Sequence, residues 1–240
     1  MIKIHFVDTN PKIVAALAAR FAPADGYPDV VISKKSVTEL HTDVIVTPTN
    51  AHGNMNGGVD AALKNLYGVG LEQRLKAEIR KLPGGTLDVG EAVVCQLVPG
   101  APRYLVAAAT MVGEGDDISR TINSALACAA AFQAIYTAVA RSGNLVETVA
   151  IPGLGGGTGK VSPQKVAEML HVGYTLFRRR RYADTSSLLD ALKEELNARS
   201  TSLLVERTIE PVILPGKLPS SAPVPAIATD PFLAFASEIE

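Results

Sequence analysis

Residues 43–60 read Asp-Val-Ile-Val-Thr-Pro-Thr-Asn-Ala-His-Gly-Asn-Met-Asn-Gly-Gly-Val-Asp, and this stretch decides the fold. Its Val44–Val46 run is apolar and β-branched, which predicts a strand buried on both faces. We expect the strand to end at residues 47–50, because Pro48 cannot donate to a ladder. A polar loop with three glycines follows and leads into a helical pattern at Val59. A strand, glycine loop and helix in this order present free backbone N–H groups to an anion, so the stretch predicts a ligand site.

Strand and helix patterns alternate on both sides of this stretch. Further strands are predicted at residues 2–7, 30–32, 92–95, 104–109 and 148–151, and helices at 11–21, 59–67, 71–81, 118–140, 163–177 and 186–197. This alternation predicts an α/β fold with a mixed, mostly parallel sheet of about six strands and helices on both faces. We expect one domain over residues 1–183. Residues 184–240 form a C-terminal helix and tail, and the tail is rich in proline after Ser200.

A second glycine loop, residues 153–160, follows the last predicted strand. Five of its eight residues are glycine, so its backbone can approach a ligand closely. Open α/β sheets bind ligands at the carboxyl ends of their strands, which is where this loop lies. Lys160 lacks the spacing of a P-loop lysine, and we expect it to be a solvent-exposed charge.

Composition and charge limit the classes of function. The net charge is −1, and basic residues are dispersed except for the run 178–181. This distribution of charge does not favour nucleic acid as a partner. No signal peptide or membrane span is predicted. Cys95 and Cys128 are predicted to be small core residues in a reducing, cytoplasmic compartment. The histidines at 5, 41 and 171 show no metal-ligand spacing, and no cofactor is predicted.

Asn50 and Asp60, which flank the first glycine loop, have side chains suited to chemistry on a sugar. An asparagine amide offers a donor and an acceptor to a ribose hydroxyl. A carboxylate beside an anomeric carbon can activate water for attack on an oxocarbenium-like centre. Taken singly, Asn50 would be a turn residue and Asp60 an acidic residue favoured by the helix dipole. Together, bracketing a glycine loop, they predict a site.

The same stretch resembles the macro domain, an ADP-ribose-binding module. The resemblance covers about residues 30–178, and Asn50 and Asp60 match the family's asparagine and aspartate with the same separation. Thr47 replaces the first asparagine of the family's tetrapeptide, and only Gly57-Gly58 remain of its usual four glycines. Ser36 replaces the aspartate that binds the adenine amino group in a Gly-Asp-Ile-Thr-like motif. The second glycine loop lacks the family's aromatic residue.

The resemblance implies a three-layer α/β/α fold, ADP-ribose or an ADP-ribosylated protein as the partner, and two sets of site residues. It implies catalytic roles for Asn50 and Asp60. It implies ligand-binding roles for Val37, Thr38, Asn56, Gly57, Gly58, Val59, Gly155, Gly156, Gly157, Thr158 and Gly159.

Three functions are compatible with these patterns. The first is an ADP-ribosyl hydrolase that acts on a modified protein or an acyl ester. The second is a non-catalytic reader that binds ADP-ribose and recruits partners through the C-terminal tail. The third is a Rossmann-like enzyme that binds a cofactor at the Asp8 end of the first strand. The third ranks last because no GxGxxG motif follows that strand.

Overall fold

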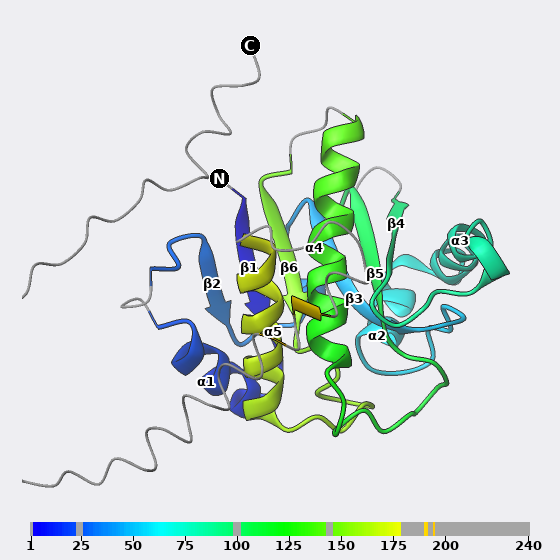
Figure 1. The fold of residues 1–240 in the computed structure, drawn as a ribbon. Helices are drawn as coiled ribbons and strands as arrows, with labels where there is room; N and C mark the ends of the chain where they lie inside the picture. Colours follow the sequence, from blue (N-terminus) through cyan, green and yellow to red (C-terminus); the bar gives the residue numbers. More distant parts are fainter. Residues whose placement is uncertain are drawn as a thin grey trace, which may run out of the picture. The chain divides into compact units, whose positions relative to one another are not determined.

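A single mixed sheet organises the chain (Figure 1). The computed structural model describes residues 2–22, 26–97, 102–142 and 146–178, with residues 190, 191 and 194. Its strands and helices are β1 Lys3–Val7, α1 Pro11–Arg20, β2 Val30–Ser33, η2 Val37–Glu39, β3 Val44–Asn50, α2 Gly58–Tyr67, α3 Gly70–Ile79, η3 Pro83–Gly85, β4 Ala92–Gln96, β5 Tyr104–Met111, α4 Asn123–Ser142, β6 Thr148–Pro152 and α5 Pro163–Arg178.

The strands lie in the order β2-β1-β6-β3-β5-β4. Every neighbouring pair is parallel except β4 and β5, which run antiparallel at one edge. This confirms the predicted α/β class and the mixed, mostly parallel sheet. The parallel strands β1, β6 and β3 therefore end at one edge of the sheet, although they come from distant parts of the sequence.

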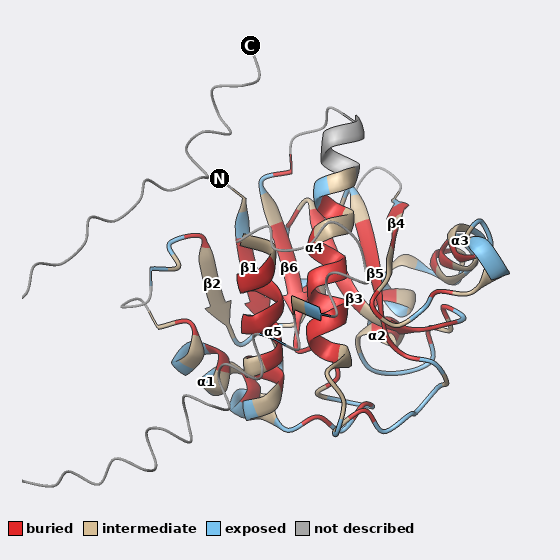
Figure 2. Cartoon of the chain, in the orientation of Figure 1, coloured by how far each residue is buried: buried red, intermediate tan, exposed pale blue. Residues whose placement is uncertain are grey.

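Alternating side chains of the strands form two cores, one on each face of the sheet. One face packs against α1, α4 and α5, and Phe6, Val46 and Ile151 are fully buried there. The other face packs against α2 and α3, with Ile45 and Ala107 fully buried. Figure 1 shows α4 and α5 crossing in front of the sheet, and Figure 2 shows that the inner strands are buried while the edge strand β2 is only partly so. The layers are those of an α/β/α sandwich.

Two helices begin where their sequences predict. The Asn10 side chain accepts a hydrogen bond from the Lys12 N–H at 3.0 Å, and Pro11 is the first residue of α1. The Ser162 hydroxyl accepts from the Lys165 N–H at 3.4 Å at the start of α5. Each cap satisfies a backbone donor that the helix itself leaves unpaired.

The prediction that Pro48 interrupts the organising strand is wrong. β3 continues through Pro48 to Asn50, and Pro48 stands opposite Ala108 in the parallel ladder with β5. Beyond Ile45, β3 no longer pairs with β6, so the strand has a neighbour on one side only. A proline is tolerated where one side of the strand needs no donor, as on an edge strand.

The helix predicted from residue 118 begins later, at Asn123. The carboxylates of Asp116 and Asp117 accept hydrogen bonds from the N–H groups of Gly113 and Ser119, at 2.7 and 3.0 Å. Such local bonds compete with helix formation. In addition, the N–H of Ile118 donates to the carbonyl of Gly159, so this segment attaches to the second glycine loop instead of starting the helix.

The C-terminal predictions lie almost wholly outside the described residues. These are the helix at 186–197, the arginine run beyond Arg178 and the proline-rich tail. The described residues all belong to one compact unit, 2–197. In this part of the chain, no helix combines the length and the apolar character needed to cross a bilayer.

Candidate active site

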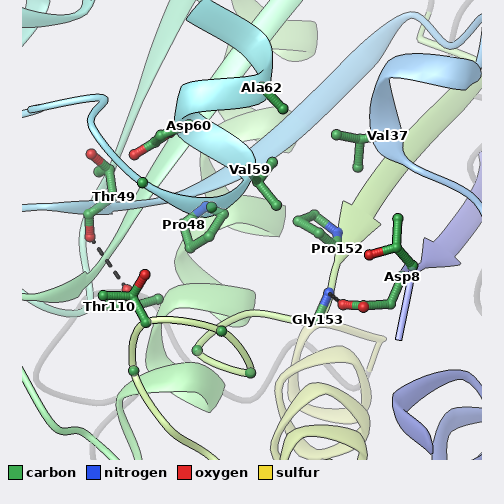
Figure 3. A pocket seen from close by; sticks show the side chains of 18 of the residues that line it. Asp8, Val37, Pro48, Thr49, Val59, Asp60, Ala62, Thr110, Pro152 and Gly153 are labelled. Atoms are coloured by element: carbon green, nitrogen blue, oxygen red, sulfur yellow. Dashed lines mark hydrogen bonds between the residues drawn. The ribbon is translucent and has the colours of Figure 1, made fainter. Parts of the chain in front are cut away.

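A cavity of about 720 Å³ lies at the carboxyl ends of β1, β3 and β6. Its walls are the ends of these strands, the loop before α2, residues 35–37, the residues that follow β5 and the glycine loop after β6. Figure 3 shows Asp60 and Thr49 on one side of this pocket, Asp8 and Val37 on the other, and Val59 and Pro48 between them. Both glycine loops singled out from the sequence therefore line a single pocket.

The predicted site residues lie around this cavity with one exception. Asn50, Asp60 and Val37 line it, as do residues 56–59 and 155–159. Thr38 does not. Its hydroxyl lies 2.8 Å from the Ser36 hydroxyl, and its N–H donates to Ser36 Oγ at 3.3 Å, within the capping box of η2. Thr38 thus stabilises the turn that presents Val37.

Asp60 is a buried carboxyl group in the first turn of α2, with 5% of its surface exposed. The Thr47 hydroxyl donates a hydrogen bond to Asp60 Oδ1 at 2.6 Å. Burial raises the pKa of Asp60 to about 7, because the hydrogen bond from Thr47, which favours the ionised carboxylate, offsets only part of the effect of burial. The charge of Glu72 raises this pKa further, and that of Lys64 lowers it. A carboxyl group that titrates near neutral pH can accept and release a proton there.

Asn50 organises the loop that follows it. Its side-chain oxygen accepts from the N–H groups of His52 and Asn54, at 3.0 and 3.3 Å, and its amide donates to the Asn54 carbonyl at 2.9 Å. These bonds engage the side-chain oxygen and one of the two amide hydrogens. Among the described residues, the second amide hydrogen has no acceptor, and Asn50 lines the cavity.

The first turn of α2 presents unpaired donors to the cavity. Gly57 precedes this helix and provides no side-chain cap. As far as the described residues go, the N–H groups of Gly58, Val59 and Asp60 have no acceptor. A helix start of this kind combines free donors with the positive end of the helix dipole, so it attracts an anion.

The second glycine loop adds donors on the opposite wall. The carbonyl of Gly157 accepts from the Lys160 N–H, and the carbonyl of Gly155 accepts from the Val161 N–H. These two bonds close the loop on itself. Within the described ranges, the N–H groups of Gly157, Thr158 and Gly159 have no acceptor of their own. Thr158 also approaches Gly57, since a Cβ at Gly57 would lie 3.6 Å from the Thr158 hydroxyl. The two sets of donors thus meet across one narrow space.

Most glycines of this loop are required by packing. A Cβ at Gly155 would lie 2.6 Å from the Ser124 hydroxyl, and one at Gly156 would lie 2.6 Å from Ile13 Cδ1. A Cβ at Gly159 would lie 2.7 Å from Ile118 Cγ1, whereas one at Gly157 would meet nothing within 4 Å. The loop therefore packs tightly against α1, the segment before α4 and the first turn of α4, and only Gly157 faces open space.

A hydrogen-bonded chain of polar side chains borders the cavity near Asp60. Asn56 donates to Glu114 Oε1 at 3.0 Å and accepts from Lys64 Nζ at 3.0 Å. Lys64 also pairs with Glu72 at 3.0 Å, and Glu72 pairs with Lys76 at 2.7 Å. This chain links the loop before α2 to the residues after β5. It keeps Asn56 at the rim, where its side chain is exposed.

The sequence analysis considered the Asp8 end of β1 only as the cofactor site of a Rossmann-like enzyme, and did not join it to the two glycine loops. Asp8, Thr9 and Asn10 line the cavity, because β1 lies directly beside β6 in the sheet. The chain separates Asp8 from Gly153 by 145 residues, yet they are hydrogen-bonded. An aspartate at the carboxyl end of a predicted parallel strand was the only signal that could have identified this wall. Lys160 is exposed and lies outside the lining, as predicted.

A metal site is absent from the described part of the chain. No group of three or more histidine, cysteine, aspartate or glutamate side chains there could hold an ion. The residues that line the cavity supply the carboxyl groups of Asp8, Asp60 and Glu114, threonine hydroxyls, asparagine amides and free backbone N–H groups.

Known proteins resemble this chain in sequence. Residues 46–170, slightly more than half of the chain, match the family described as the Macro domain. An uncharacterized protein of Aquifex aeolicus is 31% identical over 144 residues, covering 58% of this chain and 76% of the relative. An uncharacterized protein of Aeropyrum pernix is 29% identical over 150 residues, covering 62% of this chain and 72% of the relative.

Solved structures resemble it as well. The macrodomain of Oceanobacillus iheyensis with ADP superposes with a TM-score of 0.49 at 18% identity, covering 68% of this chain and 90% of the other. The macrodomain of Mycobacterium tuberculosis DarG gives a TM-score of 0.47 at 16% identity, covering 60% of this chain and 88% of the other.

Proposed function

This chain belongs to the macro domain family, and from that premise we propose that its cavity binds ADP-ribose and that the protein hydrolyses ADP-ribosyl linkages on a modified protein or an acyl ester. The observation that carries the proposal is the buried Asp60 carboxyl beside two facing sets of free N–H donors. An anionic diphosphate linked to a sugar is a ligand that suits both features.

The backbone donors suit the diphosphate. The N–H groups that begin α2 and those of residues 157–159 line the same cavity and carry partial positive charge. With the diphosphate between them, the terminal ribose lies toward Asp60 and the Asn50 amide. The nucleoside lies toward the opposite side, which Asp8 and Val37 line.

Asp60 is proposed to act as the general base. Its carboxylate accepts a proton from a water molecule while the water oxygen bonds to the anomeric carbon of the terminal ribose. The bond from that carbon to the substituent oxygen breaks, and the electron pair leaves with a carboxylate group. The products are ADP-ribose with a hydroxyl at the anomeric carbon and a free acid, and Asp60 returns its proton to solvent.

Thr47 is proposed to position this base. Its hydroxyl donates to Asp60 Oδ1, which leaves the other carboxylate oxygen to face the water. Removing the hydroxyl, as in Thr47→Val, removes an interaction that favours the ionised carboxylate. The pH at which turnover reaches half its maximum is therefore expected to rise in this variant.

The experiment combines calorimetric titration with a turnover assay. Wild type and Asp60→Asn are titrated with ADP-ribose and then assayed on a protein carrying ester-linked ADP-ribose. Asp60→Asn is expected to bind ADP-ribose and to lose about 10²–10⁴-fold in turnover. Asp43→Asn is the matched control, because Asp43 lies at the other end of the sheet and also accepts backbone hydrogen bonds.

Each outcome is informative. Binding without turnover by the wild type would make the protein a reader of ADP-ribose instead of a hydrolase. Unchanged turnover in Asp60→Asn would remove Asp60 from the mechanism. A wild type that fails to bind ADP-ribose would overturn the proposed function.

A further inference from the structure

Thr49 brings a second threonine hydroxyl to the Asp60 side of the cavity (Figure 3). Successive side chains of a strand alternate between the two faces of the sheet, so Thr47 and Thr49 point to the same face of β3. Thr47 bonds to Asp60 on that face, and Thr49 lies closer to the carboxyl end of the strand, where the cavity lies. Both hydroxyls therefore belong to the surroundings of the Asp60 carboxyl.

The Thr49 hydroxyl is left without a protein partner. This residue is 2% exposed, and its Oγ1 atom forms no hydrogen bond with any described residue. Asp60 is close, because Thr49 is among the groups that lower the pKa of that carboxyl against the larger effect of burial. Burying a hydroxyl without a partner destabilises a folded protein. Such a hydroxyl on a cavity wall is suited to a partner that belongs to the reaction.

The main chain around Thr49 is fixed. The pairing of β3 with β5 shifts register between Thr49 and Asn50, which leaves Thr110 as an extra residue on β5. The Thr110 hydroxyl donates to the Thr49 carbonyl at 3.3 Å, and the Thr110 carbonyl accepts from the Asn123 side-chain amide at 2.9 Å. Irregularities of this kind set the direction of side chains next to active sites.

A water molecule is the partner that suits this position. The Thr49 hydroxyl and the Asp60 oxygen that does not accept from Thr47 are two hydrogen-bonding groups on one wall of the cavity. A hydroxyl donates one hydrogen bond and accepts two, so one water molecule can bridge a hydroxyl and a carboxylate. A water held at two points has a fixed orientation, and the orientation of the attacking group contributes to the rate of a reaction.

We propose that the Thr49 hydroxyl holds the water molecule that attacks the anomeric carbon, which makes Thr49 a catalytic residue beside Asp60. This inference rests on the proposed function, since it assumes that Asp60 is the general base. One hydrogen of the water bonds to Asp60 and the other to the Thr49 oxygen, so that a lone pair of the water faces the sugar. The first hydrogen passes to Asp60 as a proton while the water oxygen bonds to the anomeric carbon. The electron pair of the broken bond leaves with the carboxylate group, and the new hydroxyl of ADP-ribose keeps the second hydrogen.

The test compares the wild type with Thr49→Val, which keeps the shape of the side chain without the hydroxyl, and with Thr49→Ser, which keeps the hydroxyl. Each protein is titrated with ADP-ribose by calorimetry and assayed on a protein carrying ester-linked ADP-ribose. The assay is run at roughly pH 8.5, where a base that titrates near neutral pH is ionised, so that a change in the pKa of Asp60 does not limit turnover. Thr49→Val is expected to bind ADP-ribose as the wild type does and to lose about tenfold in kcat with KM unchanged. Thr49→Ser should keep most of the wild-type kcat.

Thr175→Val is the matched control. Thr175 is another buried threonine whose hydroxyl has no partner among the described residues, but it lies in α5 and does not line the cavity. Each valine variant removes an unpaired hydroxyl, so neither should melt below the wild type. Thr175→Val should keep the wild-type kcat, in contrast to Thr49→Val.

The outcomes separate this inference from the proposed function. A wild-type kcat in Thr49→Val would overturn the role of Thr49 and leave the proposed function intact. Loss of ADP-ribose binding in that variant would also overturn the role, because the hydroxyl would then contact the nucleotide. A melting temperature well below that of the wild type would show that the hydroxyl is bonded within the protein, and would overturn the role as well. Failure of the wild type to bind ADP-ribose or to turn over the substrate would overturn the proposed function, and the role of Thr49 with it.

Discussion

Burial of Asp60 predicts that Asp60→Asn stabilises the protein, by an amount that depends on pH. In the folded state the pKa of Asp60 is about 7, whereas its ordinary value is 3.8. Between these values the folded chain keeps a proton that the unfolded chain has released. Stability of the wild type therefore falls as pH rises through this window, and the loss stays constant above it. Asparagine has no charge to bury, so the variant does not show this loss.

The size of the effect follows from the width of that window. Each pH unit changes the free energy of unfolding by about 1.4 kcal/mol, and the window spans roughly three units, which gives ~4 kcal/mol. In a domain of this size each kcal/mol shifts the melting temperature by about 2–4 °C. The variant is expected to melt roughly 10 °C above the wild type at about pH 8 and close to the wild type at about pH 4.

Thermal unfolding of both proteins across this pH range measures the difference directly. Asp43→Asn provides a control of opposite sign. Burial alone would raise the pKa of Asp43, but hydrogen bonds from Glu147 and Thr148 and the charge of Arg103 lower it. Asp43 therefore contributes stability above its ordinary pKa, and its replacement should lower the melting temperature at neutral pH. Parallel curves for wild type and Asp60→Asn would refute the argument from burial.

Three further predictions concern the site and the core. Under the proposed mechanism, turnover should rise with pH and reach half its maximum near pH 7, because a general base works only when ionised, and a pH–rate profile measures this. Gly155→Ala should destabilise the fold by about 1–3 kcal/mol in denaturant titrations, since it combines a positive φ with a close contact, whereas Gly157→Ala should leave stability unchanged. Burial raises the pKa of Cys95 to about 12 and also raises that of Cys128, so neither thiol should react with a thiol reagent before the protein unfolds; labelling of the native protein would contradict this.

The periodicity of apolar residues and the positions of proline and glycine predicted most of the fold. The strands and helices of the described residues lie where alternation, capping and proline patterns predict them, and the sheet is mixed and mostly parallel. The two differences have a common cause, which is tertiary context. Pro48 is accommodated because β3 has one neighbour at that point, and Ile118 is drawn out of the helix by the carbonyl of Gly159. Neither partner is visible from local sequence.

The candidate site could be predicted only in part, for a related reason. Asn50, Asp60 and the two glycine loops could be found because each lies at the end of a predicted strand. Their roles stay predictions, whereas their presence in one cavity is observed. Asp8 could not be assigned to that cavity, because sequence does not reveal that β1 lies between β2 and β6. The packing role of Gly156 against Ile13 was hidden for the same reason.

The second glycine loop packs against α1, so the cavity depends on residues that precede the family match. The stretch that matches the family starts at residue 46, yet Ile13 supports the loop and Asp8 holds its first residue. A fragment that begins at residue 46 would lose β1, α1, β2, η2 and the first two residues of β3, and with them one wall of the cavity. Substitutions at Ile13 can therefore alter recognition from outside the stretch by which the family is identified. The cavity described above therefore includes the first strand, which lies outside the family match.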